Sequence, residues 1–324
     1  MTILSRPQTQ SISQALEATA RDAREYVRDS VPASTRRAYA TDWATFSEWC
    51  CVHRLPNMPA APATVALFAA ERAKSIRPSS VRRALAAIAK MHKVNGQPSP
   101  CAQEPVPSTI KGIERAHGAN VIPKAPANLA VIEKLLAVFP IDALDGIRNR
   151  AILLVGFAGA FRRSELVALE ARDLAWSDEG VVITLRQSKT DQRGEGMQKA
   201  LPFVPGATCA ATALRAWLTA AGITEGPIFR PMNRNGLPKP EPLNPQSVAL
   251  IIKGACERAG LDPTAYSGHS LRAGHVTEAR AKGISDADTM SVTGHKRVET
   301  LNLYDRRGNP FRKTSAGGVL GKKP

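Results

Sequence analysis

The last third of the chain contains Gly268-His269-Ser270-Leu271-Arg272, followed by Thr293-Gly294-His295-Lys296 and then by Tyr304. Buried arginine and histidine are costly unless they are paired, so this is a poor composition for a structural core. It suits chemistry on a phosphodiester, because an arginine fork fits the non-bridging oxygens and a tyrosine oxygen can attack the phosphorus. We therefore expect this region to hold a catalytic site.

Two earlier blocks extend the pattern. The first is Gly159-Ala160-Phe161-Arg162-Arg163-Ser164-Glu165-Leu166, and the second is Ser188-Lys189-Thr190. In their order and in their residues, the four blocks resemble those of the tyrosine site-specific recombinases, also called the phage integrase family. They are similar to that family's first arginine motif, its lysine hairpin, its His-x-x-Arg box, and its final histidine and nucleophile. Four blocks in this order within about one domain length form a specific signal.

The resemblance implies a role for each block. Tyr304 is the nucleophile, which attacks the scissile phosphate and forms a covalent 3′-phosphotyrosyl bond. Arg162 and Arg272 bind the non-bridging oxygens, and Lys189 is the general acid. His269 and His295 serve in proton transfer and hydrogen bonding, and Glu165 holds a guanidinium or imidazole. Because the covalent bond conserves the energy of the cut strand, we expect no metal, no ATP and no other cofactor.

Two of these assignments compete with a neighbouring residue. Arg162 stands two residues before Ser-Glu-Leu, and this register favours it over Arg163, because adjacent helical residues point about 100° apart. Lys189 lies on a hairpin that also carries Arg193 and Lys199. Hairpin tips are mobile, so we expect Lys189 to engage on bound DNA.

The composition indicates a nucleic-acid partner. Lysine and arginine number 44 against 28 aspartates and glutamates, which gives a formal net charge of +16. Together with the motifs, this charge predicts double-stranded DNA with short recognition sites. No apolar run approaches the roughly 18 to 20 residues of a membrane span, and the start of the chain lacks a secretory pattern. The 5 cysteines have no zinc-type spacing. We expect a cytoplasmic, nucleoid-associated protein.

Hydrophobic periodicity predicts a mainly α protein with a small antiparallel sheet. The expected helices are 11–29, 34–52 with Ser34 as its cap, 62–74, 79–94, 105–117, 129–138, 146–158, 210–220, 245–259, 270–282 and 286–292. β-branched runs predict a hairpin of strands 181–185 and 199–204. A segment with two prolines and little periodicity precedes Asn128. We therefore predict a helical domain over 1–117, a linker over 118–127, a catalytic domain over 128–310 and a tail over 311–324. The resemblance implies that the first domain is a SAM-like core-binding domain, which clamps the duplex with the catalytic domain.

Basic residues gather in the N-terminal domain. One side of the expected helix 79–94 carries several of them, away from its apolar positions. Beside a phosphodiester site, we interpret this side as a face that follows DNA phosphates. The candidate DNA-binding residues are Arg36, Arg37, Arg77, Arg82, Arg83, Lys90 and Lys93.

The resemblance further implies a homotetramer on paired sites, with accessory DNA-bending or directionality proteins as further partners. Two other functions stay open from the sequence: relaxation of DNA as in type IB topoisomerases, and site-specific binding by a catalytically silent protein. One segment departs from the family pattern. In that family a segment after the nucleophile often packs on the neighbouring protomer, whereas residues 305–324 contain several glycines and look too broken for a long helix.

Overall fold

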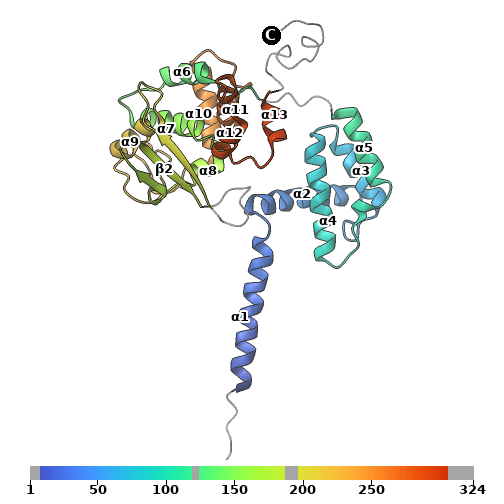
Figure 1. Ribbon diagram of the computed structural model, residues 1–324. Coiled ribbons are helices and arrows are strands. Elements are labelled where there is room, and N and C mark those ends of the chain that lie inside the picture. Colours follow the sequence, from blue (N-terminus) through green and yellow to red (C-terminus); the bar gives the residue numbers. More distant parts are fainter. Residues whose placement is uncertain (1–7, 119–123, 187–195, 306–324) are drawn as a thin grey trace, which may run out of the picture. The chain divides into compact units, whose positions relative to one another are not determined.

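The structure is a computed structural model, which describes residues 8–118, 124–186 and 196–305. The chain divides into two compact units, residues 1–122 and 123–324. Both are drawn in Figure 1, and each is described here by itself. Residues 306–324, which include the predicted tail, and the hairpin tip with Lys189 lie outside the described residues.

The N-terminal unit is entirely helical in its described part. Its elements are α1 (Gln8–Asp29), α2 (Ala33–Val52), α3 (Pro62–Arg72), α4 (Pro78–Val94), a 3₁₀ turn (Pro100–Ala102) and α5 (Val106–His117). Prolines stand in the first turn of α3, α4 and α5, where the missing N–H costs nothing. The predicted cap Ser34 is wrong, because α2 already begins at Ala33 with Pro32 as its N-cap residue.

Aromatic side chains form the core of this unit. Phe46 and Phe68 are buried and meet edge to face, with 5.1 Å between their ring centroids. His92 is also buried: its Nε2 accepts a hydrogen bond from the Ala60 N–H at 2.9 Å, and its Nδ1 lies 2.8 Å from the Ile88 carbonyl. Both ring nitrogens are therefore satisfied inside the core, so this histidine has a structural role.

The second unit combines helices with a small sheet. Its elements are α6 (Leu129–Ala137), α7 (Leu144–Ala158), α8 (Arg163–Val167), a 3₁₀ turn (Ala171–Asp173), β1 (Leu174–Trp176), β2 (Gly180–Leu185), β3 (Met197–Pro202), α9 (Ala210–Ala221), α10 (Pro245–Arg258), α11 (Gly268–Ala281), α12 (Asp286–Thr293) and α13 (Val298–Asp305). The strands are antiparallel in the order β1-β2-β3, and Val182 pairs with Ala175 on one side and Ala200 on the other. The predicted fold, mainly α with a small antiparallel sheet, is confirmed.

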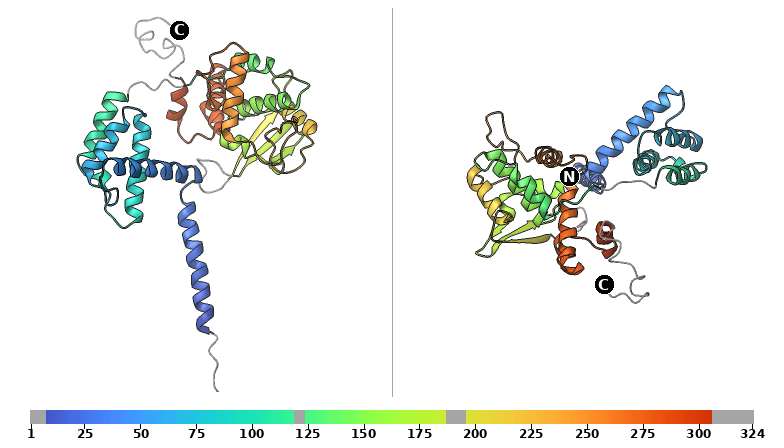
Figure 2. Two further views of the ribbon diagram at one scale, coloured as in Figure 1. Left: turned by 180° about the vertical axis from the view of Figure 1, so that it is seen from behind. Right: turned by 90° about the horizontal axis from the view of Figure 1, so that it is seen from above.

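Helix α7 is the central element of this unit. Residues 151–155 along it are almost completely buried, as expected for the continuous apolar run that begins at Ala151. It packs against α9 and α11, and Figure 2 shows the unit from two further sides. Because α7 ends immediately before the first arginine block, the core fixes where that block begins.

The predicted linker is partly built into the second unit. The Ala125 N–H donates to the Ala265 carbonyl at 2.8 Å, and the Ala127 N–H donates to the Ser270 carbonyl at 2.9 Å. A Cβ atom on Gly274 would lie 1.8 Å from the Ala127 carbonyl oxygen, so only glycine allows this contact. Residues 124–127 are therefore held against the start of α11.

None of the helices in the described part of the chain is long and apolar enough to span a membrane.

Candidate active site

The first arginine block forms a strained turn between α7 and α8. Phe161 is buried, and a Cβ atom on Gly159 would lie 2.1 Å from its ring, so the turn requires glycine there. Ala160 follows with a φ of +46°, a left-handed conformation that is unfavourable for alanine. The turn delivers Arg162 to the N-cap position of α8.

Glu165 holds Arg162 in two ways. Its Oε2 accepts the Arg162 backbone N–H at 2.9 Å, and its Oε1 accepts a hydrogen bond from Arg162 Nη1 in an ion pair. The Glu165 side chain is only 4% exposed, so this contact is a charge-assisted one with little solvent around it. Arg163 has a different neighbour: its stem lies against Gly268, where a Cβ would be 2.0 Å from Arg163 Cδ. The geometry thus gives the two adjacent arginines different partners.

Arg272 is a buried guanidinium, 1% exposed, on α11. Its Nη1 donates to the Ala160 carbonyl at 2.8 Å, and its Nη2 lies 3.1 Å from His295 Nε2. The first contact stabilises the strained turn that presents Arg162. Arg272 therefore links the first arginine block to the final histidine block.

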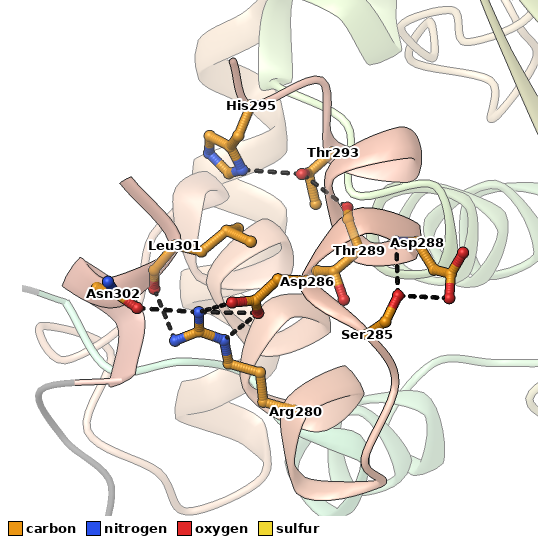
Figure 3. A network of polar contacts seen from close by, with 9 residues as sticks. All are labelled: Arg280, Ser285, Asp286, Asp288, Thr289, Thr293, His295, Leu301 and Asn302. Atoms are coloured by element: carbon orange, nitrogen blue, oxygen red, sulfur yellow. Dashed lines mark hydrogen bonds and ion pairs between the residues drawn. The ribbon is translucent and has the colours of Figure 1, made fainter. Parts of the chain in front are cut away.

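His295 belongs to a directed chain of hydrogen bonds, which Figure 3 shows from His295 to Thr289. A guanidinium can only donate, so His295 Nε2 accepts from Arg272 and the proton of the neutral ring lies on Nδ1. Nδ1 lies 2.8 Å from Thr293 Oγ1, and Thr293 Oγ1 donates to the Thr289 carbonyl at 2.8 Å. Burial and the nearby guanidiniums of Arg272 and Arg162 lower the pKa of His295 to about 4.

His269 and Arg162 line one cavity. This cavity has a volume of about 250 Å³, and its walls are formed by Arg162, Arg163, Ser164, Pro245, Gly268 and His269. Ser267 caps α11 by accepting the His269 N–H at 3.3 Å, so α11 begins at Gly268, two residues before the predicted start. Partial burial, followed by the charges of Arg272, Arg162 and Arg163, lowers the pKa of His269. The lowered pKa favours the neutral ring beside a cavity that two arginines line.

The nucleophile candidate lies on α13. Tyr304 is in the last turn of this helix, and Leu301, on the same helix, is fully buried and anchors it. The Tyr304 side chain and the whole of Lys189 lie outside the described residues. Their proposed roles therefore rest on their position in the sequence and on the groups around them.

Lys199 is a site residue that the sequence argument did not select. It is 2% exposed, its Nζ donates to the carbonyls of Gly159 and Val292, and it lies 4.6 Å from the centre of the Phe161 ring. Burial, and to a lesser extent the charges of Arg272 and Arg162, lower its pKa to about 7, although Glu165 opposes the shift. Lys199 thus joins β3 to the segments that precede Arg162 and His295. The sequence did carry a signal, because Lys199 shares a strand face with the apolar Leu201.

His275 is a second unselected group. It lies on α11 with its ring 6.1 Å from that of Phe157, in an edge-on arrangement. Burial and the neighbouring charges of Lys199 and Arg272 lower its pKa to about 4, against the effect of a hydrogen bond with the Phe157 backbone. Its ring therefore packs against a side chain of α7.

The model of the phage integrase family matches residues 129–309. This match covers more than half of the chain and contains every candidate catalytic residue. The chain belongs to the phage integrase family.

Relatives of this integrase-family chain agree with that assignment. An integrase/recombinase XerD homolog from Selenomonas ruminantium is 36% identical over 304 residues, 93% of this chain and 89% of the relative. Recombinase Cre of Escherichia phage P1 is 23% identical over 282 residues, 81% of this chain and 80% of the relative. These are tyrosine recombinases, which are DNA strand-transfer enzymes, and site-specific DNA recombination is therefore the function of the family to which this chain belongs.

A solved structure shows the same fold. The Tn1549 transposon integrase, in complex with transposon right end DNA, matches with a TM-score of 0.63 at 13% sequence identity, over 93% of this chain and 98% of that chain. At this identity the likeness concerns the fold alone. Because it covers 93% of this integrase-family chain, the likeness extends into both units.

Proposed function

We propose that this integrase-family enzyme cuts and rejoins DNA at short recognition sites, with Tyr304 as its nucleophile. The observation that carries the proposal is the convergence of separate sequence blocks on one place. Arg162, which Glu165 holds in an ion pair, lines a cavity with His269. Arg272 makes hydrogen bonds with the Ala160 carbonyl and with His295. A phosphodiester is the substrate that this arrangement of donors fits best.

In the proposed cleavage step, the oxygen of Tyr304 forms a bond to phosphorus while the bond from phosphorus to the 5′ oxygen breaks. The phenol proton passes to His269, directly or through water, and Lys189 gives a proton to the departing 5′ oxygen. Arg162 and Arg272 stabilise the charge that grows on the non-bridging oxygens. Rejoining reverses these steps with a 5′ hydroxyl from another strand. Side chains of the protein therefore exchange the protons and stabilise the phosphate charge in both directions.

Double-stranded DNA is the proposed partner. The net charge of +16 favours a polyanion, and the Tn1549 integrase, whose fold is the same, is described in complex with transposon DNA. In the N-terminal unit, Arg37, Arg77, Lys90 and Lys93 are exposed, and we propose that they follow the phosphate backbone.

Two of the candidate DNA-binding arginines already have acidic partners. Arg83 makes a bidentate contact with Asp42, at 2.7 and 3.0 Å, and Arg82 pairs with Glu114. Arg36 donates to the carbonyls of Arg28 and Val31, each at 2.7 Å. We propose that Lys90 and Lys93 make the main phosphate contacts on α4, because binding a phosphate would break no ion pair that the structure describes for them.

Recombination of paired sites requires four strand cleavages. We therefore propose a homotetramer, assisted at some sites by DNA-bending or directionality proteins.

The two alternative functions differ from recombination in their products. A topoisomerase would relax a plasmid without exchanging sites, and a silent binder would leave it unchanged. The relative from Selenomonas ruminantium, named an integrase/recombinase and aligned over 93% of this chain, favours recombination.

The test is a plasmid assay. A supercoiled plasmid carrying two copies of DNA from the flank of the coding sequence is incubated with the enzyme and then cut with a restriction enzyme. Exchanged fragments, absent with Tyr304→Phe, are the expected result. Relaxation without exchange would favour the topoisomerase alternative, and binding with neither product would favour the silent protein.

A further inference from the structure

A single guanidinium joins three helices near the end of the described chain. Arg280, in the last turn of α11 and with its side chain 15% exposed, donates to both carboxylate oxygens of Asp286 at the start of α12. It also reaches α13, where Nη1 lies 3.3 Å from the Leu301 carbonyl and Nη2 lies 3.1 Å from Asn302 Oδ1. Figure 3 shows these contacts converging on Arg280.

The contacts on α13 lie close to the nucleophile candidate. Leu301 and Asn302 precede Tyr304 by three and two residues, within the same turn of helix. α13 has only 8 residues, and an isolated helix of that length is marginal in water. Its position must therefore come from tertiary contacts, which in the described side chains include the burial of Leu301 and the contacts of Arg280.

The same contacts connect the nucleophile helix to the phosphate-binding groups. α11 carries His269 and Arg272 near its beginning and Arg280 in its last turn. α12 leads into the segment that carries His295. A displacement of α13 relative to Arg280 therefore changes the distance from Tyr304 to the groups that would hold the phosphate.

We propose that Arg280, oriented by Asp286, is a positioning residue that fixes α13 and thereby sets the line of attack of Tyr304. This inference rests on the proposed role of Tyr304. Among the described residues, Arg280 contacts Asp286, Leu301 and Asn302, none of which is a reacting group, so we expect its effect in the rate of cleavage on bound DNA and not in the affinity for DNA. A substitution at Asn302 tests this positioning role separately from the stability of the fold, because Asn302 is exposed and its side chain buries little apolar surface.

The experiment compares Asn302→Ala with Asn302→Asp. Alanine removes the acceptor on α13, whereas aspartate keeps it and adds a charge opposite Arg280. The assay measures the rate of covalent adduct formation on saturating nicked duplex, the affinity for the same duplex and the melting temperature. Asn233→Ala is the matched control, because it also removes an exposed acceptor amide, at 2.9 Å from the Asn235 N–H, in a turn outside these three helices.

We expect Asn302→Ala to slow adduct formation roughly three- to tenfold, as for the loss of one typical intramolecular hydrogen bond, with affinity unchanged and a melting temperature no lower than that of Asn233→Ala. Asn302→Asp and Asn233→Ala should keep the wild-type rate. Equal rates for Asn302→Ala and wild type would overturn the inference while leaving the proposed function intact. A parallel fall in affinity and rate would also overturn it. Adduct formation by Tyr304→Phe would remove the proposed function itself.

Discussion

The guanidinium of Arg272 and the imidazole of His295 share a hydrogen bond, with 3.1 Å between Nη2 and Nε2. The direction of this bond is fixed because arginine has no acceptor, and so the proton of the neutral ring lies on Nδ1, facing Thr293. In this state Nε2 cannot donate to a phosphate. A hydrogen bond from His295 to the scissile phosphate requires that Nε2 gain a proton when Arg272 turns to the substrate.

This relationship predicts a coupled change in protonation. In the free protein His295 should titrate with a pKa of about 4, and its nitrogen chemical shifts should report the Nδ1–H tautomer. A bound phosphodiester adds a negative charge and should raise this pKa by about one unit or more. An Nε2–H tautomer in the free protein would contradict the assignment.

The same shift makes a prediction for stability. Between pH 4 and pH 6.5 the unfolded chain protonates the histidine at position 295 and the folded chain does not, so the folded state loses stability as the pH falls through this window. In His295→Gln, which keeps an acceptor for Arg272, the loss on acidification should be smaller. Thermal unfolding measured across this range checks the difference, and identical slopes for the two proteins would count against it.

Arg272 should contribute to both the fold and the reaction. Arg272→Lys keeps the charge but cannot donate to the Ala160 carbonyl and to a phosphate through one planar fork. We expect the cleavage barrier to rise by about 3 to 4 kcal/mol, as for a lost oxyanion donor. Single-turnover cleavage at saturating DNA measures the effect. Arg258→Lys is a suitable control, because Arg258 lies over the Phe139 ring on α10. A rate within about twofold of wild type would be inconsistent with a phosphate contact by Arg272.

Lys199 gives a stability prediction of the same sign in an alkaline pH window. Its pKa in the folded protein is about 7, whereas an unfolded lysine titrates near 10.4. Between these values the unfolded state binds more protons, so the folded state gains stability as the pH rises from 7 to about 10, by at most about 1.4 kcal/mol per pH unit. Lys199→Met removes this gain and leaves the Gly159 and Val292 carbonyls without their donor.

Chemical denaturation at pH 7 and pH 9 tests this prediction. The difference in unfolding free energy between wild type and Lys199→Met should grow with pH. Lys239→Met is the control, since Lys239 is exposed and pairs with Glu241. A difference that stays constant with pH would show that Lys199 keeps an ordinary pKa.

The basic face of α4 predicts a salt dependence. Each lysine that neutralises a phosphate contributes about 0.9 to the slope of log affinity against log salt. Lys90→Gln and Lys93→Gln should each reduce the slope by about one, uniformly across DNA sequences. Arg83→Gln should reduce it less, because Arg83 must first leave Asp42. A larger effect at Arg83 than at Lys90 would assign the main phosphate contact to the paired arginine.

The helices were largely predictable because the sequence marks them in several ways at once. Apolar periodicity, prolines in the first turn of α3, α4 and α5, and buried runs such as α7 agree with one another. Strand β1 was missed, because its 3 residues, Leu174–Trp176, contain no β-branched side chain. Its place in the sheet comes from pairing with β2, which no local pattern encodes.

The candidate site was predictable as a set of residues but not as a network. Family motifs named Arg162, Arg272 and the histidines, whereas Lys199 looked like an ordinary hairpin charge. Its burial depends on Gly159 and Val292, which are distant in sequence. The contacts of Arg280 with α12 and α13 depend in the same way on tertiary packing.

The central claim is that Tyr304 forms a covalent bond to DNA, and a denaturing-gel assay tests it most directly. Nicked duplexes tiled from DNA that flanks the coding sequence are incubated with wild type and with Tyr304→Phe, in chelator and without ATP. We predict an adduct at one defined sequence with wild type and none with Tyr304→Phe. Tight site-specific binding without an adduct in either protein, or an adduct that persists in Tyr304→Phe, would contradict the claim.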